Sequence, residues 1–281
     1  GTTTVADIEA VPELLPEVWN STPLRIFSFL EITGVRSKRA PREILGEAIE
    51  KINSLAHPRC RAGLSPHAPY STPLELLKLS AEIAREKNLR LTTHVAESEQ
   101  EFEMFARARG EMFDWLKKNG RDNSDCGLGS PVQHLQRAGL PGENFLAVHA
   151  NYLAETDFDL LAKSKTSVVH CPRSHAYFRH QKFPLEKLLA KKINVCLGTD
   201  SLATVAKNGK EKLELNLFRE MQTLARTNPQ LPSEAILQRA TANGARALGR
   251  AGQSGELAEN AFAYFISVPF AVKISNAAAA A

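Results

Sequence analysis

The sequence alternates short apolar, β-branched runs with amphipathic stretches at helical spacing, and this alternation constrains the fold more than any other feature. The spacing predicts strands at residues 1–5, 24–33, 61–65, 89–93, 145–148, 166–169 and 193–197. It predicts helices at residues 41–52, 72–84, 98–118, from 156 onward, and at 184–191, 213–226 and 232–248, with a last β segment at 255–268. Parallel strands need a long crossover, usually a helix, so repeated strand–helix units indicate an α/β fold with a parallel sheet.

Doubly wound sheets and (β/α)8 barrels both satisfy this alternation. No G-x-G-x-x-G or Walker word follows an early strand, and such a word is the main sequence signature of a nucleotide-binding doubly wound sheet. The absence of this signature leaves a barrel as the favoured arrangement.

Composition narrows the range of partners. The net charge of the 281 residues is only +4, and basic residues are mixed with acidic ones along the chain, so we expect no nucleic-acid partner. No apolar run approaches the roughly 20 residues of a membrane helix, so we expect no membrane partner. The four cysteines form no C-x-x-C pair and suit a reducing compartment, the cytoplasm. These features leave a small molecule as the expected partner.

Histidine or a carboxylate stands at the C-terminal ends of five successive predicted strands. Five of the eight histidines lie at these junctions: His67, His94, His149, His170 and His175. A single histidine at a strand end is more often a structural residue, but five in succession are harder to explain that way. In a barrel the C-terminal strand ends converge on one face, where catalytic groups lie.

The residue types at these ends suit a hydrolytic metal site. A divalent metal such as zinc takes imidazole nitrogen and carboxylate oxygen ligands and keeps one position open for water. The metal makes that water a hydroxide nucleophile near neutral pH, and a carboxylate that is not a ligand can move the proton to a leaving group. His94 and Glu97 end the same strand three positions apart, a spacing that allows one to reach a metal and the other the substrate.

Five sequence words at these strand ends resemble the amidohydrolase superfamily, specifically its branch of metal-dependent deaminases and chlorohydrolases. The words are GLSPHAPY at 63–70, HVAE at 94–97, the strand that ends at His149, CPRSH at 171–175 and LGTDS at 197–201. This branch includes S-adenosylhomocysteine/methylthioadenosine, guanine, cytosine and aminodeoxyfutalosine deaminases and triazine hydrolases. The resemblance covers roughly residues 1–257 and implies a (β/α)8 TIM-type barrel with a small β-sandwich.

The resemblance implies a role for each matching residue. His94 would be a metal ligand, Asp200 would ligate the metal and accept the proton of the bound water, and Glu97 would be the proton shuttle. His149 would orient the bound water or the developing charge of the substrate. The implied cofactor is one divalent metal, zinc rather than iron, and the resemblance also allows a homodimer. The implied substrate-binding residues are His67, Arg173, Ser174 and His175.

The chain departs from the family at its start. The family supplies two further metal ligands from a His-x-His word on the first barrel strand, whereas this sequence has no such word and its first histidine is His57. We therefore expect a barrel of about seven strands over residues 1–254, a return to a small β-sandwich at 255–270 and a tail at 271–281. The chain as written is expected to bind metal poorly and to be inactive, since a catalytic zinc site typically has three protein ligands. The intact gene product is expected to be active.

Three functions remain open at this level. The first is hydrolytic deamination of an amino-substituted purine, pyrimidine or nucleoside-like heterocycle by a metal-bound hydroxide. The second keeps the site but cleaves a C–Cl or amide-type C–N bond, as a chlorohydrolase or amidase does. The third is a catalytically silent subunit that lacks its full metal site. The motifs favour a hydrolase but do not separate the first two reactions.

Overall fold

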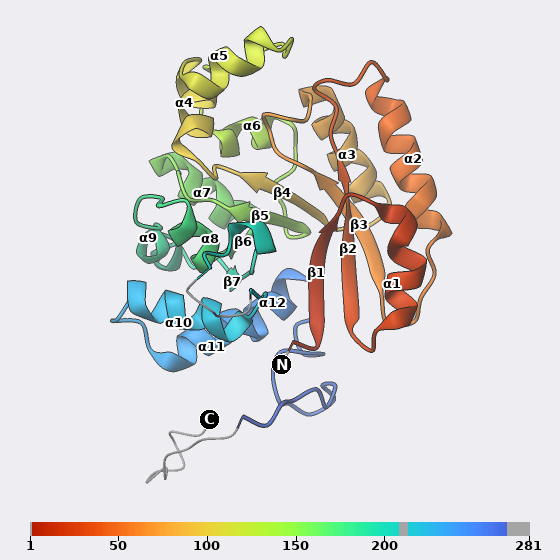
Figure 1. Cartoon of the computed structure of the whole chain (residues 1–281), viewed down its shortest axis with the longest axis vertical. Helices are drawn as coiled ribbons and strands as arrows, with labels where there is room; N and C mark the ends of the chain where they lie inside the picture. Colours follow the sequence, from red (N-terminus) through yellow and green to blue (C-terminus); the bar gives the residue numbers. More distant parts are fainter. Residues whose placement is uncertain (1, 208–212, 269–281) are drawn as a thin grey trace.

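The computed structural model describes residues 2–207 and 213–268, and its centre is a fully parallel sheet of seven strands. Strands that follow each other in sequence are neighbours in space, so the order is β1 to β7, with β1 and β7 at the edges of the described sheet. The sheet is curled into a half-barrel (Figure 1), as expected for a TIM-type barrel that lacks a strand. The strands are β1 (Thr4–Glu9), β2 (Arg25–Ile32), β3 (Arg61–Pro66), β4 (Leu91–Val95), β5 (Phe145–His149), β6 (Ser167–His170) and β7 (Val195–Leu197).

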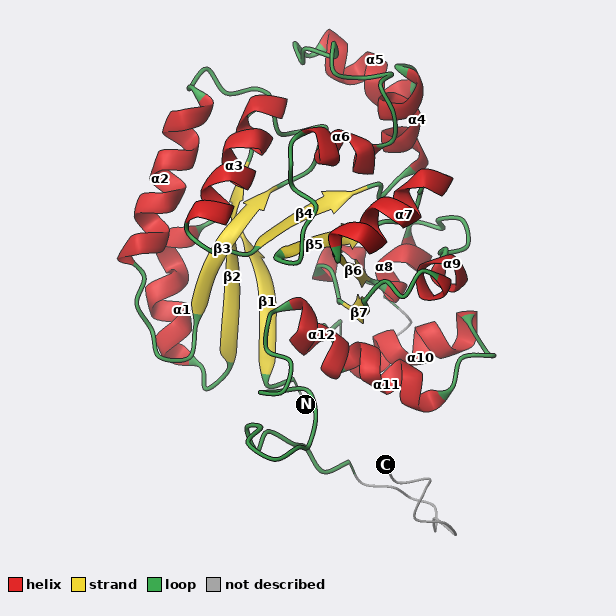
Figure 2. Ribbon diagram, turned by 180° about the vertical axis from the view of Figure 1, so that it is seen from behind, coloured by secondary structure: helices red, strands yellow, loops and turns green. Residues whose placement is uncertain are grey.

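Helices connect successive strands, and most of them lie around the outside of the sheet, as Figures 1 and 2 show from opposite sides, whereas Ala247 of the last helix packs against side chains on the inner face. Within the described ranges, none of them combines the length and apolarity that crossing a membrane requires. The α-helices are α1 (Leu15–Ser21), α2 (Pro41–Ser54), α3 (Leu74–Glu86), α4 (Glu99–Arg107), α5 (Glu111–Lys118), α6 (Pro131–Arg137), α7 (Glu155–Ser164), α8 (Pro172–Tyr177), α9 (Leu185–Ala190), α10 (Leu217–Thr227), α11 (Ser233–Ala240) and α12 (Ala242–Ala247). Two short 3-10 turns, η1 (Pro12–Leu14) and η2 (Leu202–Thr204), complete the described elements.

The main core lies between the sheet and the helices. On the strands it includes Ile32, Leu64 and Val168, which pack with apolar side chains of α2, α3, α7 and α9. A second, smaller cluster contains Phe29 of β2 and Leu146 of β5 and fills the inside of the curve. Since successive side chains of a strand point to opposite faces, these two clusters show which residues face the helices and which face the interior.

Most of the predicted elements are confirmed, and the clearest errors concern helix boundaries. The predicted helix at 98–118 is two helices, because the chain turns at Gly110 with a φ of 101°. The predicted helix at 232–248 is interrupted at Thr241, whose ψ of −94° ends α11. Helix α10 begins four residues later than predicted, because the Asn216 side chain accepts hydrogen bonds from the first N–H groups of the helix. Two short helices were not predicted: α1 and α8.

The strand predicted at residues 255–268 is wrong. These residues form turns and irregular chain, and several of their apolar side chains are exposed, Phe265 at 72%. A strand requires a partner for its N–H and C=O groups, and this segment pairs with none of the described strands. The segment instead contacts β2, where the Arg25 guanidinium lies 4.3 Å from the ring centre of Phe262. Residues 269–281 lie outside the described part of the chain, so the division at 254/255 and 270/271 stays a prediction.

Asp7 supports a prediction about stability. Its Oδ1 accepts a hydrogen bond from Ser28 Oγ, which in turn accepts one from Trp19 Nε1, so the carboxyl helps attach α1 to the sheet. Burial raises the pKa of Asp7 to about 6. A raised pKa in the folded state means that the free energy of unfolding falls as the pH rises from about 4 to about 6. We expect Asp7→Asn to stabilise the protein at pH 7 by about 1 kcal/mol, since asparagine carries no charge to bury.

The measurement is urea unfolding of both proteins at pH 4 and pH 7. The stabilisation by Asp7→Asn should be present at pH 7 and absent at pH 4, where the carboxyl of the folded wild-type protein is itself neutral. An equal difference at both pH values would show that the charge of Asp7 has no part in the effect.

Candidate functional site

The acidic and imidazole groups of the site lie at the ends of three strands. Each of these strand ends includes a residue whose backbone is in the left-handed (positive φ) conformation. These residues are Ala96 after β4, His149 at the end of β5 and Asp200 after β7, with φ values of 52°, 73° and 53°. Such values are costly for residues other than glycine, and they recur at functional sites, where the surrounding structure maintains them. The backbone conformation therefore turns the chain sharply at each of these three strand ends.

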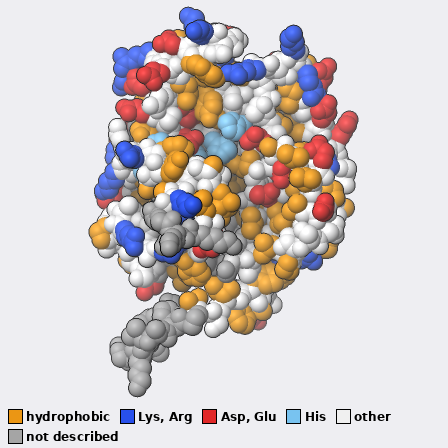
Figure 3. Space-filling model, viewed as in Figure 1, with side chains coloured by type: hydrophobic (Ala, Val, Ile, Leu, Met, Phe, Trp, Pro, Cys, Tyr) orange, Lys and Arg blue, Asp and Glu red, His pale blue; other side chains and the backbone are white. Residues whose placement is uncertain are grey.

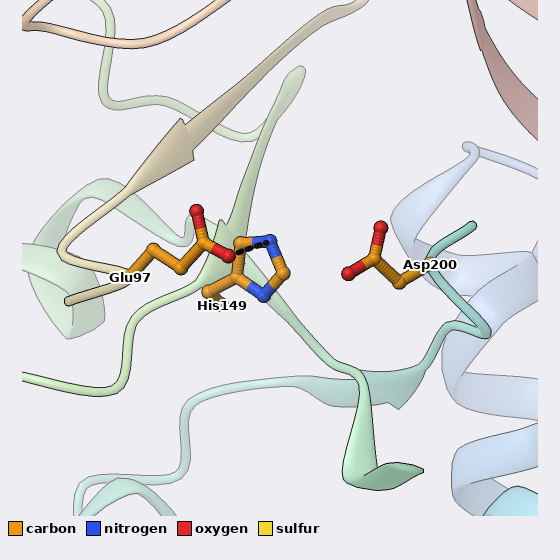
Figure 4. A group of neighbouring side chains, drawn as sticks. All are labelled: Glu97, His149 and Asp200. Carbon is orange, nitrogen blue, oxygen red and sulfur yellow. Dashed lines mark ion pairs between the residues drawn. The ribbon is translucent and has the colours of Figure 1, made fainter. Parts of the chain in front are cut away.

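The turn at His149 changes which way its ring points. Ala147, two residues earlier on β5, packs in the helix-side core, and simple alternation would send His149 to the same side. The positive φ turns the chain instead, and His149 Nε2 lies 3.6 Å from Glu97 Oε1. Figure 4 shows the ring between the two carboxylates, with Asp200 on the side opposite Glu97.

Glu97, His149 and Asp200 form the closest group of potential metal ligands among the described residues. One ligand atom from each lies within 4.8 Å of those of the other two. Glu97 follows β4, His149 ends β5 and Asp200 follows β7, so the first and last of them are more than one hundred residues apart. Figure 3 shows histidine side chains gathered near the middle of this face of the molecule, with acidic side chains close by.

Burial sets the charge state of the group. It holds the pKa of His149 well below its usual range, with the neighbouring His94 as the next cause, so the ring is neutral near pH 7. Burial, followed by the negative charge of Asp200, raises the pKa of Glu97 to about 7. The contact between Glu97 and His149 is therefore a polar contact rather than a salt bridge of two full charges, although its length would allow one. A carboxyl with a pKa near 7 can both give and take a proton under ordinary conditions.

His94 lies beside this group but is not one of its three members. Its Nδ1 is 2.9 Å from the backbone oxygen of His67, and because a carbonyl only accepts, Nδ1 must carry the proton. That leaves Nε2 with a free lone pair, and burial lowers the pKa of the ring, which keeps it neutral. The ring is stacked on that of His149 with centres 5.6 Å apart. A metal-binding histidine usually has this arrangement, with one nitrogen anchored and the other available.

Buried side chains that the sequence analysis missed hold Glu97 in place. The two carboxylate oxygens of Glu101 accept hydrogen bonds from the backbone N–H groups of Ala96 and Glu97, at 3.0 and 2.9 Å. Asn151 Nδ2 donates to the backbone oxygen of Glu97 at 2.9 Å. Glu101 is four residues from Glu97 on the first turn of α4, and this spacing was a signal that could have been noticed.

We expect Glu101→Gln to lower the free energy of unfolding by about 1–3 kcal/mol, because glutamine offers one acceptor oxygen where two buried N–H groups need partners. Urea unfolding measures the difference, and Glu99→Gln, at an exposed position of the same helix turn, is the matched control. If Glu101→Gln unfolds at the same urea concentration as the control, the two hydrogen bonds do not stabilise this turn.

Asp200 is held from two directions. Its Oδ2 accepts a hydrogen bond of 2.6 Å from Ser174 Oγ, and its Oδ1 accepts one of 2.8 Å from the N–H of Ser201. Ser174 is buried at the start of α8, so its contact with Asp200 fixes the carboxylate rather than leaving the hydroxyl free for a ligand. In this position the Ser174 hydroxyl holds Asp200, whereas the resemblance implies that Ser174 binds substrate. The substrate-binding role stays a prediction.

The other residues expected to bind substrate have protein partners in the structure. Arg173 Nη1 donates to the backbone oxygen of Glu214 at 3.0 Å, and the Arg173 N–H donates to Glu220. His175 Nδ1 lies 3.1 Å from Asn151 Oδ1 and donates to it. Arg173 Nη1 and His175 Nδ1 are therefore already hydrogen-bonded to protein groups. A substrate would have to contact these two residues through their other side-chain nitrogens.

His67 and His170 differ in their surroundings. His67 follows β3, and its ring centre lies 5.0 Å from that of His94, so it belongs to the same face as the candidate site. His170 is buried and stacked on Phe183 with ring centres 3.7 Å apart. Because Phe183 belongs to the helix-side core, His170 faces away from the site. Beside the site, a cavity of about 520 Å³ lies between α4, α7 and α9, with Asn151 in its lining.

Comparison with known sequences gives a family match over nearly the whole chain. The sequence profile described as the amidohydrolase family matches residues 1–279. A 5-methylthioadenosine/S-adenosylhomocysteine deaminase of Syntrophobacter fumaroxidans is 35% identical over 76% of this chain and 44% of that protein. The protein of the same name from Pyrococcus furiosus is 36% identical over 72% of this chain and 43% of that protein. A 5'-deoxyadenosine deaminase of Methanothermobacter thermautotrophicus is 32% identical, with the same two coverages. The chain thus spans less than half the length of these relatives.

Solved structures share the fold. An adenosine deaminase from Xanthomonas campestris with bound zinc superposes with a TM-score of 0.74 at 24% identity, over 91% of this chain and 55% of that chain. The aminofutalosine deaminase of Helicobacter pylori gives a TM-score of 0.79 at 21% identity, over 94% of this chain and 64% of that chain. A triazine hydrolase variant gives 0.74 at 18% identity, over 92% and 58%. At these identities the likeness shows the fold alone.

Proposed function

The chain belongs to the amidohydrolase family, and we propose that the intact gene product is a metal-dependent hydrolase that deaminates an adenosine-type nucleoside. The observation that carries the proposal is the meeting of Glu97, His149 and Asp200, whose ligand atoms lie within 4.8 Å of one another. Relatives at 32–36% identity are named as deaminases of 5-methylthioadenosine, S-adenosylhomocysteine and 5'-deoxyadenosine, which supports this substrate class.

The donor atoms suit one divalent metal, and we propose zinc rather than iron. His94 Nε2 and the Asp200 carboxylate would hold it, and they are the nitrogen and oxygen donors that zinc prefers. A bound zinc lowers the pKa of water toward neutrality and so supplies a nucleophile. The 281 residues contain no His-x-His word, so in this proposal the remaining ligands come from protein outside them.

Each of the three close residues has a distinct part in the reaction. Asp200, anchored by Ser174, accepts the proton of the attacking water. Glu97, with a pKa of about 7, gives its proton to the ring nitrogen of the heterocycle, takes a second one from the hydroxyl that has added to the ring carbon, and gives that one to the departing ammonia. The proton that Asp200 took from the water then returns Glu97 to its protonated form. His149 is held neutral by burial, and its position between the two carboxylates lets it orient the water.

The test is a substrate panel with the intact gene product loaded with zinc. Ammonia release is measured with 5'-methylthioadenosine, S-adenosylhomocysteine, 5'-deoxyadenosine and guanine, and chloride release is measured with a chlorotriazine. Ammonia from one or more of the adenosine compounds is the expected result. Chloride release alone would favour the chlorohydrolase reaction, which the triazine hydrolase likeness of the fold makes the second candidate. No product from any compound would favour a silent subunit.

We also propose that the protein works in the cytoplasm. All four cysteines are free and buried, and none is placed to form a disulfide. A chain with several unpaired thiols suits a compartment that keeps thiols reduced.

A further inference from the structure

We propose that Glu31 is a specificity-determining residue that accepts hydrogen bonds from the sugar hydroxyls of a nucleoside substrate. This inference rests on the proposed function, because it concerns the part of the substrate remote from the reacting carbon. Glu31 is near the C-terminal end of β2, the end of the sheet where the candidate site lies.

The strand places the Glu31 side chain on the inside of the curved sheet. Phe29, two residues earlier on β2, packs in the interior cluster, whereas Ile32 packs in the helix-side core. Alternation along the strand therefore directs Glu31 to the interior. Its pairing partner on β3 is Ser65, two residues before His67, so Glu31 and His67 belong to adjacent strand ends.

The Glu31 carboxylate is partly buried but has no hydrogen-bond or ion-pair partner in the described part of the chain. Burial raises the pKa of this carboxyl. A partly buried carboxylate without a donor is unfavourable, and a bound ligand with hydroxyl groups would satisfy it.

His67 provides a second polar group at the adjacent strand end. Its Nδ1 lies 2.6 Å from Ser71 Oγ, which also lies 3.2 Å from the backbone oxygen of Ala68. Burial lowers the pKa of this ring, so it is neutral near pH 7 and has one donor and one acceptor nitrogen.

The two oxygens of the Glu31 carboxylate are both hydrogen-bond acceptors. A pair of acceptors matches a ligand with a pair of donors, and the two neighbouring hydroxyls of ribose are such donors. Adenosine-type nucleosides carry this diol, so Glu31 would distinguish ribonucleosides from analogues that lack it. Hydrogen bonds to a charged partner contribute enough to change affinity by about 10–100-fold.

The test measures binding of deamination products, so that it does not depend on turnover. Inosine and 2',3'-dideoxyinosine, which lacks both hydroxyls, are titrated calorimetrically into the metal-loaded intact gene product. The variants are Glu31→Ala, which removes both acceptor oxygens, and Glu31→Gln, which keeps one neutral acceptor and serves if the alanine variant does not fold. Glu50→Ala is the matched control, because Glu50 is an exposed glutamate on α2.

The wild-type protein and the Glu50→Ala control are expected to bind inosine about 10–100-fold more tightly than the dideoxy compound. In Glu31→Ala this preference should fall below about threefold, with Glu31→Gln intermediate. A wild-type preference that persists in the Glu31 variants, or a wild-type protein that binds both compounds equally or neither, overturns the inference. If the preference behaves as expected but no adenosine compound releases ammonia, the proposed function fails while the role of Glu31 stands.

Discussion

Replacing Glu97 with glutamine in the intact gene product is expected to slow ammonia release by about 10²–10⁴-fold, the usual contribution of a positioned proton donor. Glutamine keeps the size of the side chain but cannot gain or lose a proton in this pH range. The hydrogen bonds that Ala96 and Glu97 donate to Glu101 come from the backbone, so the turn itself is not disturbed.

The measurement is kcat for the best adenosine compound, together with zinc content and thermal unfolding. Zinc content and stability should stay close to the wild-type values, which separates loss of proton transfer from loss of the site. Glu99→Gln, exposed two positions further on, is the control and should keep full activity. A loss of less than tenfold for Glu97→Gln would remove Glu97 from the role of proton shuttle.

Asp200→Asn is the second variant with a large expected effect. Asparagine fills the same space and can still accept from Ser174 or Ser201, but it lacks the negative charge that binds a metal and accepts a proton. We expect kcat to fall by about 10³-fold or more, because proton acceptance alone is typically worth about 10²–10⁴-fold. Zinc content should fall as well, which distinguishes this variant from Glu97→Gln.

Zinc per molecule is measured by elemental analysis after gel filtration, alongside kcat. Asp114→Asn, which changes an exposed carboxylate on α5, is the control and should leave both values unchanged. An Asp200→Asn protein that retains one zinc per molecule and more than a tenth of its activity would contradict both parts of the role proposed for Asp200.

Much of this fold could be predicted because its signals are local. A strand such as β2 is recognisable from its β-branched and aromatic residues, and a crossover of helical length between two such strands implies that they are parallel. The breaks at Gly110 and Thr241 were missed because the apolar spacing continues on both sides of each break. The prediction of a strand at 255–268 was wrong because a strand forms only where a neighbouring strand pairs with it. The sequence of the segment does not show whether such a neighbour is present.

The candidate site, like the fold, could be predicted from the sequence only in part. Glu97, His149 and Asp200 could be named from the sequence because each follows an apolar run, and the ends of parallel strands meet on one face. The structure brings these three together. Their support could be predicted only in part. Glu101 follows Glu97 by four residues, a spacing that is visible in the sequence, whereas the hydrogen bond from Asn151 joins two segments that are far apart in the sequence.

The sequence by itself determined the order of strands and helices and the chemical groups at the strand ends, because both follow from the local order of apolar and polar residues. Only the tertiary structure decided the direction of the His149 ring, the anchoring of Asp200 by Ser174 and the lack of a partner for Glu31 among the described residues. A positive φ such as that of His149 is unfavourable for the isolated chain and persists only where packing from distant segments compensates for it. Contacts between residues 26 positions apart, as between Ser174 and Asp200, leave no periodic signal in the sequence.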